Sequence, residues 1–158
     1  MGTLVLDKEV IDALNNPKAV KVLATVGSDG VPHVVFKGSL HANVHGYVEY
    51  WELIESSQTN KNMVHSIWFG KQIAISVLLE HRSWQIKGIP YRAIIAGQEF
   101  ELCYNEVQEK LDTDLSTVWL IEVQSVVEES FEKRQAEELA AHPILQHVDR
   151  VLDKAAFA

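Results

Sequence analysis

Cysteine is almost absent from this sequence, because Cys103 is the only one among 158 residues. A single cysteine excludes an internal disulfide framework and a metal cluster held by thiolates, and it favours a reducing compartment. We therefore expect a cytoplasmic protein. Arginine is also scarce, and it occurs only at Arg82, Arg92, Arg134 and Arg150. A site in which several arginines clamp a phosphate is accordingly difficult to build from this chain.

Positive charge as a whole is in the minority. The chain carries 14 basic against 22 acidic side chains, which gives a net charge of −8. Such a balance argues against a nucleic-acid-binding surface and against binding to anionic membranes. No apolar run approaches the length of a membrane span, and residues 1–7 lack the basic and apolar regions of a signal peptide. We expect neither a nucleic-acid partner nor a membrane partner.

Apolar residues make up 47% of the chain, which is enough for one substantial core. Alternating and β-branched segments predict strands over residues 19–26, 31–40, 47–54, 72–79, 84–95 and 117–127. The run 72–79 is nearly all apolar, which is typical of a strand covered on both faces. Gly88 and Pro90 predict a bulge or bend in the next strand, and such bends let a small sheet close into a barrel.

Helical periodicity predicts helices over residues 8–14 and 98–111, and a turn separates the strands at residues 41–46. The chain changes character after residue 127. Residues 128–141 are charged and rich in alanine, and His142–Pro143 begins a second helix with one apolar stripe. We therefore expect a barrel domain over residues 1–127. A C-terminal helical extension over residues 128–158 is expected to pack on the barrel or on a second subunit.

Hydroxyls, amides and a lysine gather where a short helix is expected to begin in the middle of the chain. The residues concerned are Ser57, Gln58, Thr59, Lys61 and Asn62. Free backbone N–H groups and the positive end of the helix dipole favour an anion such as phosphate at this place. Ser, Thr and Asn are also the commonest N-cap residues, so helix capping explains the same side chains equally well.

Seven histidines raise the question of a metal or a haem. None of them has the spacing of a known metal motif, and we expect no metal site. A haem ligand would be sought at His142 or His147. Cys103 lies on the inward stripe of the helix predicted over residues 98–111, so it is expected to be an inert buried thiol.

The order of these elements resembles that found in a known family. The segments that show the resemblance are Ala24–Thr25–Val26, the turn Asp29–His33, the helix start with Asn62–Met63, the apolar strand and Ile86–Lys87–Gly88. Together they resemble the pyridoxamine 5'-phosphate oxidase-related, FMN-binding split-barrel family over roughly residues 6–126. The resemblance implies a mainly β fold with flanking helices, built on a six-stranded split β-barrel. It also implies a homodimer with one FMN in each of two clefts at the interface.

The resemblance also assigns site residues by position. The strand after the Asp-Gly-x-Pro-His turn lies along the flavin in this family, which points to Val35, Phe36, Lys37, Gly38 and Ser39. The following strand supplies groups near the ring and the ribityl chain, which points to Tyr50 and Trp51. A helix start of the pattern S/T-x-K-x-x-N-L grips the phosphate, which points to Ser57, Gln58, Thr59, Lys61 and Asn62. The lysine of that pattern falls on Thr59, and Lys61 lies two residues later.

The resemblance implies a flavoprotein that binds FMN. Such a protein would act as an oxidoreductase on a small substrate or electron acceptor. Lys37 and Ser39 are candidates for stabilising the reduced ring at its N1 and O2 edge, and Trp51, Trp68 and Trp84 are candidates for stacking on it. Vitamin B6 oxidation is not expected, because the acidic tail replaces the substrate-binding segment of the true oxidases. Three alternatives stay open: binding of F420, binding of haem, and a non-catalytic binding or stress protein with weak flavin affinity.

Overall fold

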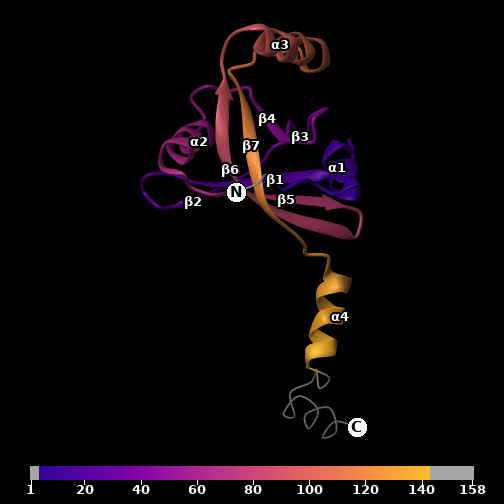
Figure 1. The fold of residues 1–158 in the computed structure, drawn as a ribbon. Helices are drawn as coiled ribbons and strands as arrows, with labels where there is room; N and C mark the ends of the chain where they lie inside the picture. The colour runs from indigo at the N-terminus through magenta and orange to yellow at the C-terminus, as the bar shows by residue number, and fades with distance from the viewer. Residues whose placement is uncertain (1–3, 143–158) are drawn as a thin grey trace, which may run out of the picture.

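The protein is built on one strongly bent antiparallel sheet (Figure 1). The computed structural model describes residues 4–142. Within this range the sheet has seven strands, in the order β2-β1-β5-β6-β7-β4-β3. The strands are β1 (Val20–Val26), β2 (Pro32–Phe36), β3 (His41–Ala42), β4 (Val48–Glu52), β5 (Ile73–Leu79), β6 (Arg82–Ile94) and β7 (Thr117–Glu128).

The prediction of six strands is wrong by one. The additional strand is β3, which pairs with β4 through His41 and Glu49 and through Ala42 and Val48. Its two residues fall in the segment that was expected to be only a turn, because such a short strand leaves no alternating pattern in the sequence. The mainly β class with flanking helices is confirmed.

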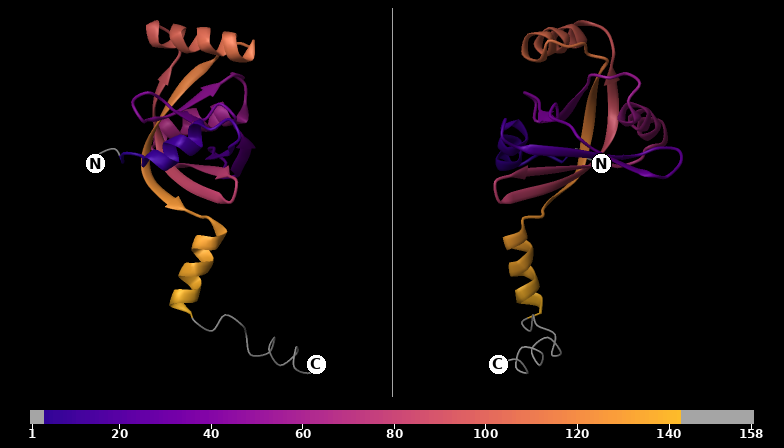
Figure 2. Two further views of the ribbon diagram at one scale, coloured as in Figure 1. Left: turned by 90° about the vertical axis from the view of Figure 1, so that its right-hand side faces the viewer. Right: turned by 180° about the vertical axis from the view of Figure 1, so that it is seen from behind.

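Four helices occur in the described part of the chain: α1 (Lys8–Asn15), α2 (Gln58–Phe69), α3 (Gln98–Leu111) and α4 (Phe131–Ala141). α1 contacts β3 and β5, whereas α2 contacts β1, β2 and β6. These two helices lie on opposite sides of the long β6–β7 ribbon (Figures 1 and 2). Each helix therefore contacts strands that are not all neighbours in the sheet. The main core includes residues of both helices and of the sheet.

The bend of the sheet depends on β6 and β7, its two longest strands. Their register shifts between Lys87 and Gly88 and again between Pro90 and Arg92, so the predicted bulge is confirmed. A Cβ atom placed on Gly88 would lie 2.5 Å from the backbone oxygen of Glu122 on β7. Glycine therefore allows the two backbones to approach at the bulge, and bulges increase the local twist of a ladder.

β5 is covered on one face only, so the prediction of a strand covered on both faces is wrong. Ile73, Ile75 and Val77 point into the core, whereas Ser76 and Leu78 are exposed. An apolar run does not show whether one face or both faces of a strand are covered, because coverage depends on how other elements pack on the sheet.

The C-terminal extension begins with α4, which projects from the end of β7 (Figure 1). None of its side chains is buried. The second helix, expected from His142 onward, lies outside the described residues, so its packing on the barrel or on a partner stays a prediction. No helix of residues 4–142 has the length and apolar character that crossing a membrane requires.

Candidate functional site

A pocket of about 470 Å³ opens between the turn after β2, the end of β4 and the C-terminal end of α3. We call it the Lys37 pocket. Its lining residues are Phe36, Lys37, Gly38, Ser39, Trp51, Glu52, Leu53, Ile54, Lys110 and Leu111. The structure thus brings together five predicted cofactor residues from two segments of the chain: Phe36, Lys37, Gly38, Ser39 and Trp51.

The turn that forms one wall of this pocket is held at both ends. β2 ends at Phe36, four residues before the predicted end of the strand, because the chain turns there and the Leu40 amide donates to the Lys37 carbonyl at 3.3 Å. The Lys37 amide donates to the Lys21 carbonyl at 2.9 Å. Ser39 Oγ donates to the Trp51 carbonyl at 2.8 Å. The wall is therefore a fixed loop that is tied to β1 and β4.

Glu52 is a residue of this pocket that sequence reasoning missed. Its side chain is 1% exposed, and every neighbour of its carboxylate is a donor. Oε1 accepts from the Ile54 amide at 3.1 Å and faces Lys37 Nζ at 3.7 Å. Oε2 accepts from Ser57 Oγ at 2.9 Å and from the Tyr50 hydroxyl. Donor groups from the chain therefore meet both oxygens of this carboxylate.

Tyr50 contacts both charged side chains of this group, Glu52 and Lys37. Burial, followed by the hydrogen bond to Glu52, raises the pKa of Tyr50 far above its ordinary value, so Tyr50 stays a neutral donor. Lys37 Nζ also lies 5.2 Å from the centroid of the Tyr50 ring. The ammonium of Lys37 is thus held between an aromatic face and a carboxylate. Tyr50 itself is buried in the core and does not line the pocket, and neither does Val35.

The start of α2 is capped by Ser57, as the capping interpretation predicts. Its Oγ accepts from the Asn60 amide at 2.9 Å. Two of the predicted phosphate ligands are turned toward the β1–β2 hairpin and are almost fully buried: Asn62 Nδ2 donates to Thr25 Oγ1 at 3.1 Å, and Thr59 Oγ1 lies 3.2 Å from His33 Nε2.

The other two predicted phosphate ligands do not reach the Lys37 pocket either. Gln58 Nε2 donates to Asn62 Oδ1 at 2.8 Å, and Lys61 is exposed. None of the five residues predicted at this helix start, Ser57, Gln58, Thr59, Lys61 and Asn62, lines the pocket. The contacts of Thr59 and Asn62 instead fasten α2 to the hairpin, and the Gln58 hydrogen bond lies within α2.

A second pocket, of about 630 Å³, lies under α3 beside the β3–β4 turn. We call it the His41 pocket. One of its polar residues is Glu49, which faces His41 Nε2 at 3.1 Å, Trp51 Nε1 at 3.0 Å and Asn43 Nδ2 at 3.2 Å. Burial opposes the charged carboxylate, but the hydrogen bonds from His41, Trp51 and Asn43 outweigh it and lower the pKa of Glu49. His41 Nδ1 donates to the Ser39 carbonyl at 2.7 Å.

The Glu49 network joins the walls of the two pockets. Trp51 lines the Lys37 pocket, and its indole N–H donates to Glu49. His41 contacts Glu49 through Nε2 and the Ser39 carbonyl through Nδ1. Both ring nitrogens of His41 have protein partners, so this histidine has a structural role. In residues 4–142 no group of three histidine, cysteine or acidic side chains has the arrangement of a metal site. His142 is exposed at the end of α4, and His147 lies outside the described residues.

Cys103 lies in the His41 pocket and is half-buried. Burial and the nearby Glu49 carboxylate raise the pKa of Cys103 to about 11. Because only the thiolate is nucleophilic, we expect alkylation by iodoacetamide at pH 8 to be about a hundredfold slower than for the unfolded chain. The rate should still rise with pH between 8 and 10, as the thiolate fraction increases. Equal rates for the folded protein and for protein unfolded in urea would contradict this account.

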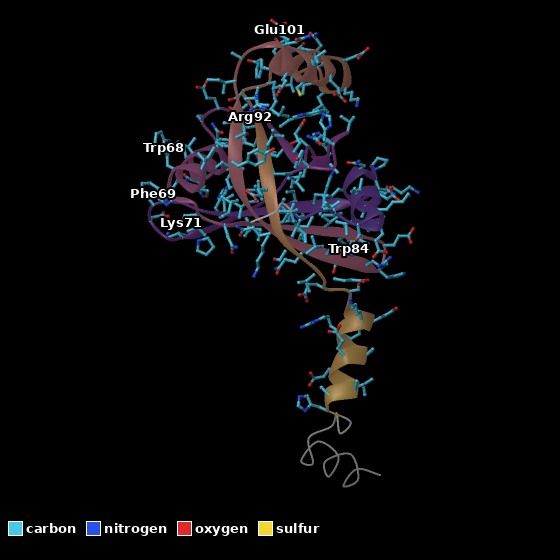
Figure 3. The ribbon with its side chains drawn as sticks, in the orientation of Figure 1. Trp68, Phe69, Lys71, Trp84, Arg92 and Glu101 are labelled. Atoms are coloured by element: carbon cyan, nitrogen blue, oxygen red, sulfur yellow. The ribbon has the colours of Figure 1, made fainter. Side chains whose placement is uncertain are left out.

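The three candidate stacking tryptophans lie on three different elements, β4, α2 and β6. Trp51 lines the Lys37 pocket, but Trp68 is 79% exposed on the outer side of α2 (Figure 3). Trp84 is buried near the β5–β6 turn, where Arg82 lies 4.6 Å from its ring centroid. Of the three, Trp51 is the one placed to contact a ligand in the Lys37 pocket.

Neither a family model nor a curated protein matches this sequence. Solved structures do match the fold. HupZ of Group A Streptococcus is 19% identical, with a TM-score of 0.67 over 80% of this chain and 96% of that chain. A candidate pyridoxamine 5'-phosphate oxidase of Lactobacillus delbrueckii is 19% identical, with a TM-score of 0.60 over 78% and 93% of the two chains.

An FMN-binding protein of Syntrophomonas wolfei is 11% identical, with a TM-score of 0.61 over 79% of this chain and 89% of that chain. The chain therefore has the split-barrel fold of the pyridoxamine 5'-phosphate oxidase-like proteins. An F420 reductase, with a TM-score of 0.55, and a haem-binding protein of Mycobacterium smegmatis, with a TM-score of 0.53, share the fold as well. Identities this low establish the fold and leave the ligand to be argued from the site.

Proposed function

We propose that this protein is a flavoprotein of the split-barrel fold whose Lys37 pocket receives the ring of a flavin, FMN being the cofactor implied by the resemblance. The observation that carries the proposal is the pocket itself. Its wall contains Phe36, Lys37, Gly38, Ser39 and Trp51, which are five of the seven residues that the resemblance places along the flavin or near its ring and ribityl chain. A volume of about 470 Å³ falls in the range of small-molecule sites.

The side chains of this pocket suit a planar heteroaromatic ring. Phe36, Trp51 and Leu53 offer apolar and aromatic surface, and Ser39 and Lys37 offer polar groups at one side. A bound flavin would supply hydride or one-electron chemistry toward a small substrate or electron acceptor. The chain would contribute position, exclusion of water and the positive charge of Lys37, whose side chain is 19% exposed.

The proposal extends to assembly and location. On the resemblance, two copies of this chain form a homodimer with the cofactor sites at their interface, and no nucleic acid or membrane is involved. The lone half-buried thiol of Cys103 suits a reducing cytoplasm.

A second candidate function is a non-catalytic split-barrel binding protein with weak flavin affinity. It is favoured by one observation: the polar groups of the pocket already have protein partners, Glu52 for Lys37 and the Trp51 carbonyl for Ser39. Binding of haem has less support, because no histidine occurs among the residues that line the Lys37 pocket. Binding of F420 remains an alternative on the likeness of fold alone.

Equilibrium titration of flavin fluorescence with the full chain tests the proposal. We expect saturable quenching that reaches one flavin per chain, because each chain has one Lys37 pocket. A dissociation constant in the micromolar range or below would favour the flavoprotein, and one near the millimolar range would favour the weak binding protein. Absence of saturable quenching would contradict the flavin proposal, and a Soret band after haem titration would then favour the haem alternative.

A further inference from the structure

The Lys37 pocket contains an anion of its own at the place where a phosphate would be expected. Glu52 is 1% exposed, lines the pocket and accepts a hydrogen bond from Ser57 Oγ at 2.9 Å. Ser57 is the N-cap of α2. The positive end of a helix dipole attracts negative charge, and here the protein supplies that charge from its own side chain.

Both cations of the pocket have acidic partners. Lys37 Nζ lies 3.7 Å from Glu52 Oε1, and Lys110 Nζ lies 2.5 Å from Glu106 Oε1. No other described residue that lines the pocket is basic. A phosphate that entered the pocket would therefore meet a buried carboxylate, and it would compete with that carboxylate for Lys37.

The residues that the family pattern assigns to the phosphate are used elsewhere. Thr59 and Asn62 face the β1–β2 hairpin, and Lys61 is exposed without lining the pocket. Arginines do not replace them, because none lines the pocket. The ring of a flavin fits the residues present, but the phosphate does not.

We infer that the Lys37 pocket recognises a flavin by its uncharged ring alone, so that its ligand class is the neutral isoalloxazine, as in riboflavin, and a phosphate adds no affinity. This inference rests on the proposed function and narrows it. A phosphate clamp of lysine, arginine and helix amides makes charge-assisted hydrogen bonds to FMN that riboflavin lacks. The Lys37 pocket has a carboxylate in place of that clamp.

The first test compares riboflavin with FMN on the full chain at low ionic strength. We expect riboflavin to bind as tightly as FMN or up to about tenfold more tightly. FMN binding tenfold or more tightly than riboflavin would overturn the inference and leave the proposed function standing. Absence of saturable binding of both flavins would overturn the proposed function, and the inference with it.

Salt gives a second test that needs no variant. Repulsion between Glu52 and a phosphate weakens as ions screen it, so FMN affinity should rise by about twofold or more between 10 mM and 300 mM salt, while riboflavin affinity stays constant. A phosphate clamp predicts the opposite sign, because salt screens attraction too. A fall in FMN affinity with salt would therefore contradict the inference.

Glu52→Gln removes the charge and keeps the size of the side chain. We expect this variant to raise the affinity for FMN relative to riboflavin by about threefold or more. Glu55→Gln is the matched control, because it removes one negative charge from an exposed residue of the same segment and should leave the ratio unchanged. An unchanged ratio in a folded Glu52→Gln protein would contradict the role of Glu52, and the salt series applies if that variant does not fold.

Discussion

Replacing Gly88 by alanine is expected to lower the free energy of unfolding by about 2–4 kcal/mol. The added Cβ would lie 2.5 Å from the Glu122 backbone oxygen and 2.8 Å from Ile121 Cγ2. Both atoms belong to β7, and Ile121 is fully buried, so neither strand can move without disturbing the core. Gly88 lies at the register shift that bends the β6–β7 ribbon, and the loss should therefore affect the whole fold.

Urea unfolding followed by circular dichroism measures this effect. Gly38→Ala is the matched control, because nothing lies within 4 Å of a Cβ built on Gly38. We expect this control to be neutral or to stabilise the protein by less than about 1 kcal/mol, since alanine restricts the unfolded chain. Similar unfolding midpoints for the two variants would show that the close approach at Gly88 is not needed.

Replacing Gly38 by tryptophan is expected to weaken flavin binding by about thirtyfold or more, because an indole would occupy volume that the ring needs. Gly38 lines the Lys37 pocket, and a Cβ atom built on it has nothing within 4 Å. The fold should therefore survive the substitution. Loss of binding with an unchanged unfolding midpoint would separate a blocked pocket from a damaged protein.

Val44→Trp is the control for this experiment. Val44 is exposed and lines the His41 pocket, so the substitution places the same side chain in a different pocket. We expect fluorescence titration to give the original flavin affinity for Val44→Trp. The reverse outcome, in which Val44→Trp abolishes binding and Gly38→Trp does not, would move the flavin site to the His41 pocket.

Local signals in the sequence predicted much of the fold. The range of α3 is the predicted one, because its apolar period ends where Asp112 takes a left-handed conformation. The bulge in β6 was predicted from Gly88 and Pro90. The exposed face of β5 was not predicted, because which face is buried depends on where the helices and other segments of the chain pack against the sheet. The pairing that forms β3 also depends on β4, which lies further along the chain.

The residues of the site were predicted only in part, and there is a physical reason why some were found and Glu52 was missed. The resemblance located Lys37 and Trp51, because it assigns residues by the order of the strands that follow the turn Asp29–His33. It did not locate Glu52, because three of the four donors around this carboxylate are the side chains of Lys37, Tyr50 and Ser57, which meet only in the folded chain. One signal was present: β4 carries two acids among aromatic residues, and acids in a buried strand need partners.

The helix start of α2 illustrates why one pattern supported two interpretations. Capping and anion binding use the same backbone amides, so both select Ser, Thr and Asn. In the structure Ser57 caps the helix through the Asn60 amide, and the anion beside it is Glu52. Sequence spacing alone could not show that the anion belongs to the protein.

A crystal structure of the protein grown with riboflavin would show whether the Lys37 pocket holds a flavin ring. We expect one isoalloxazine ring per chain in this pocket, in contact with Phe36 and Trp51, with Lys37 still beside Glu52. The ribityl chain should point away from the Glu52 carboxylate and from the start of α2. A ring found in the His41 pocket, or crystals grown at saturating riboflavin with no ring in the Lys37 pocket, would contradict this expectation.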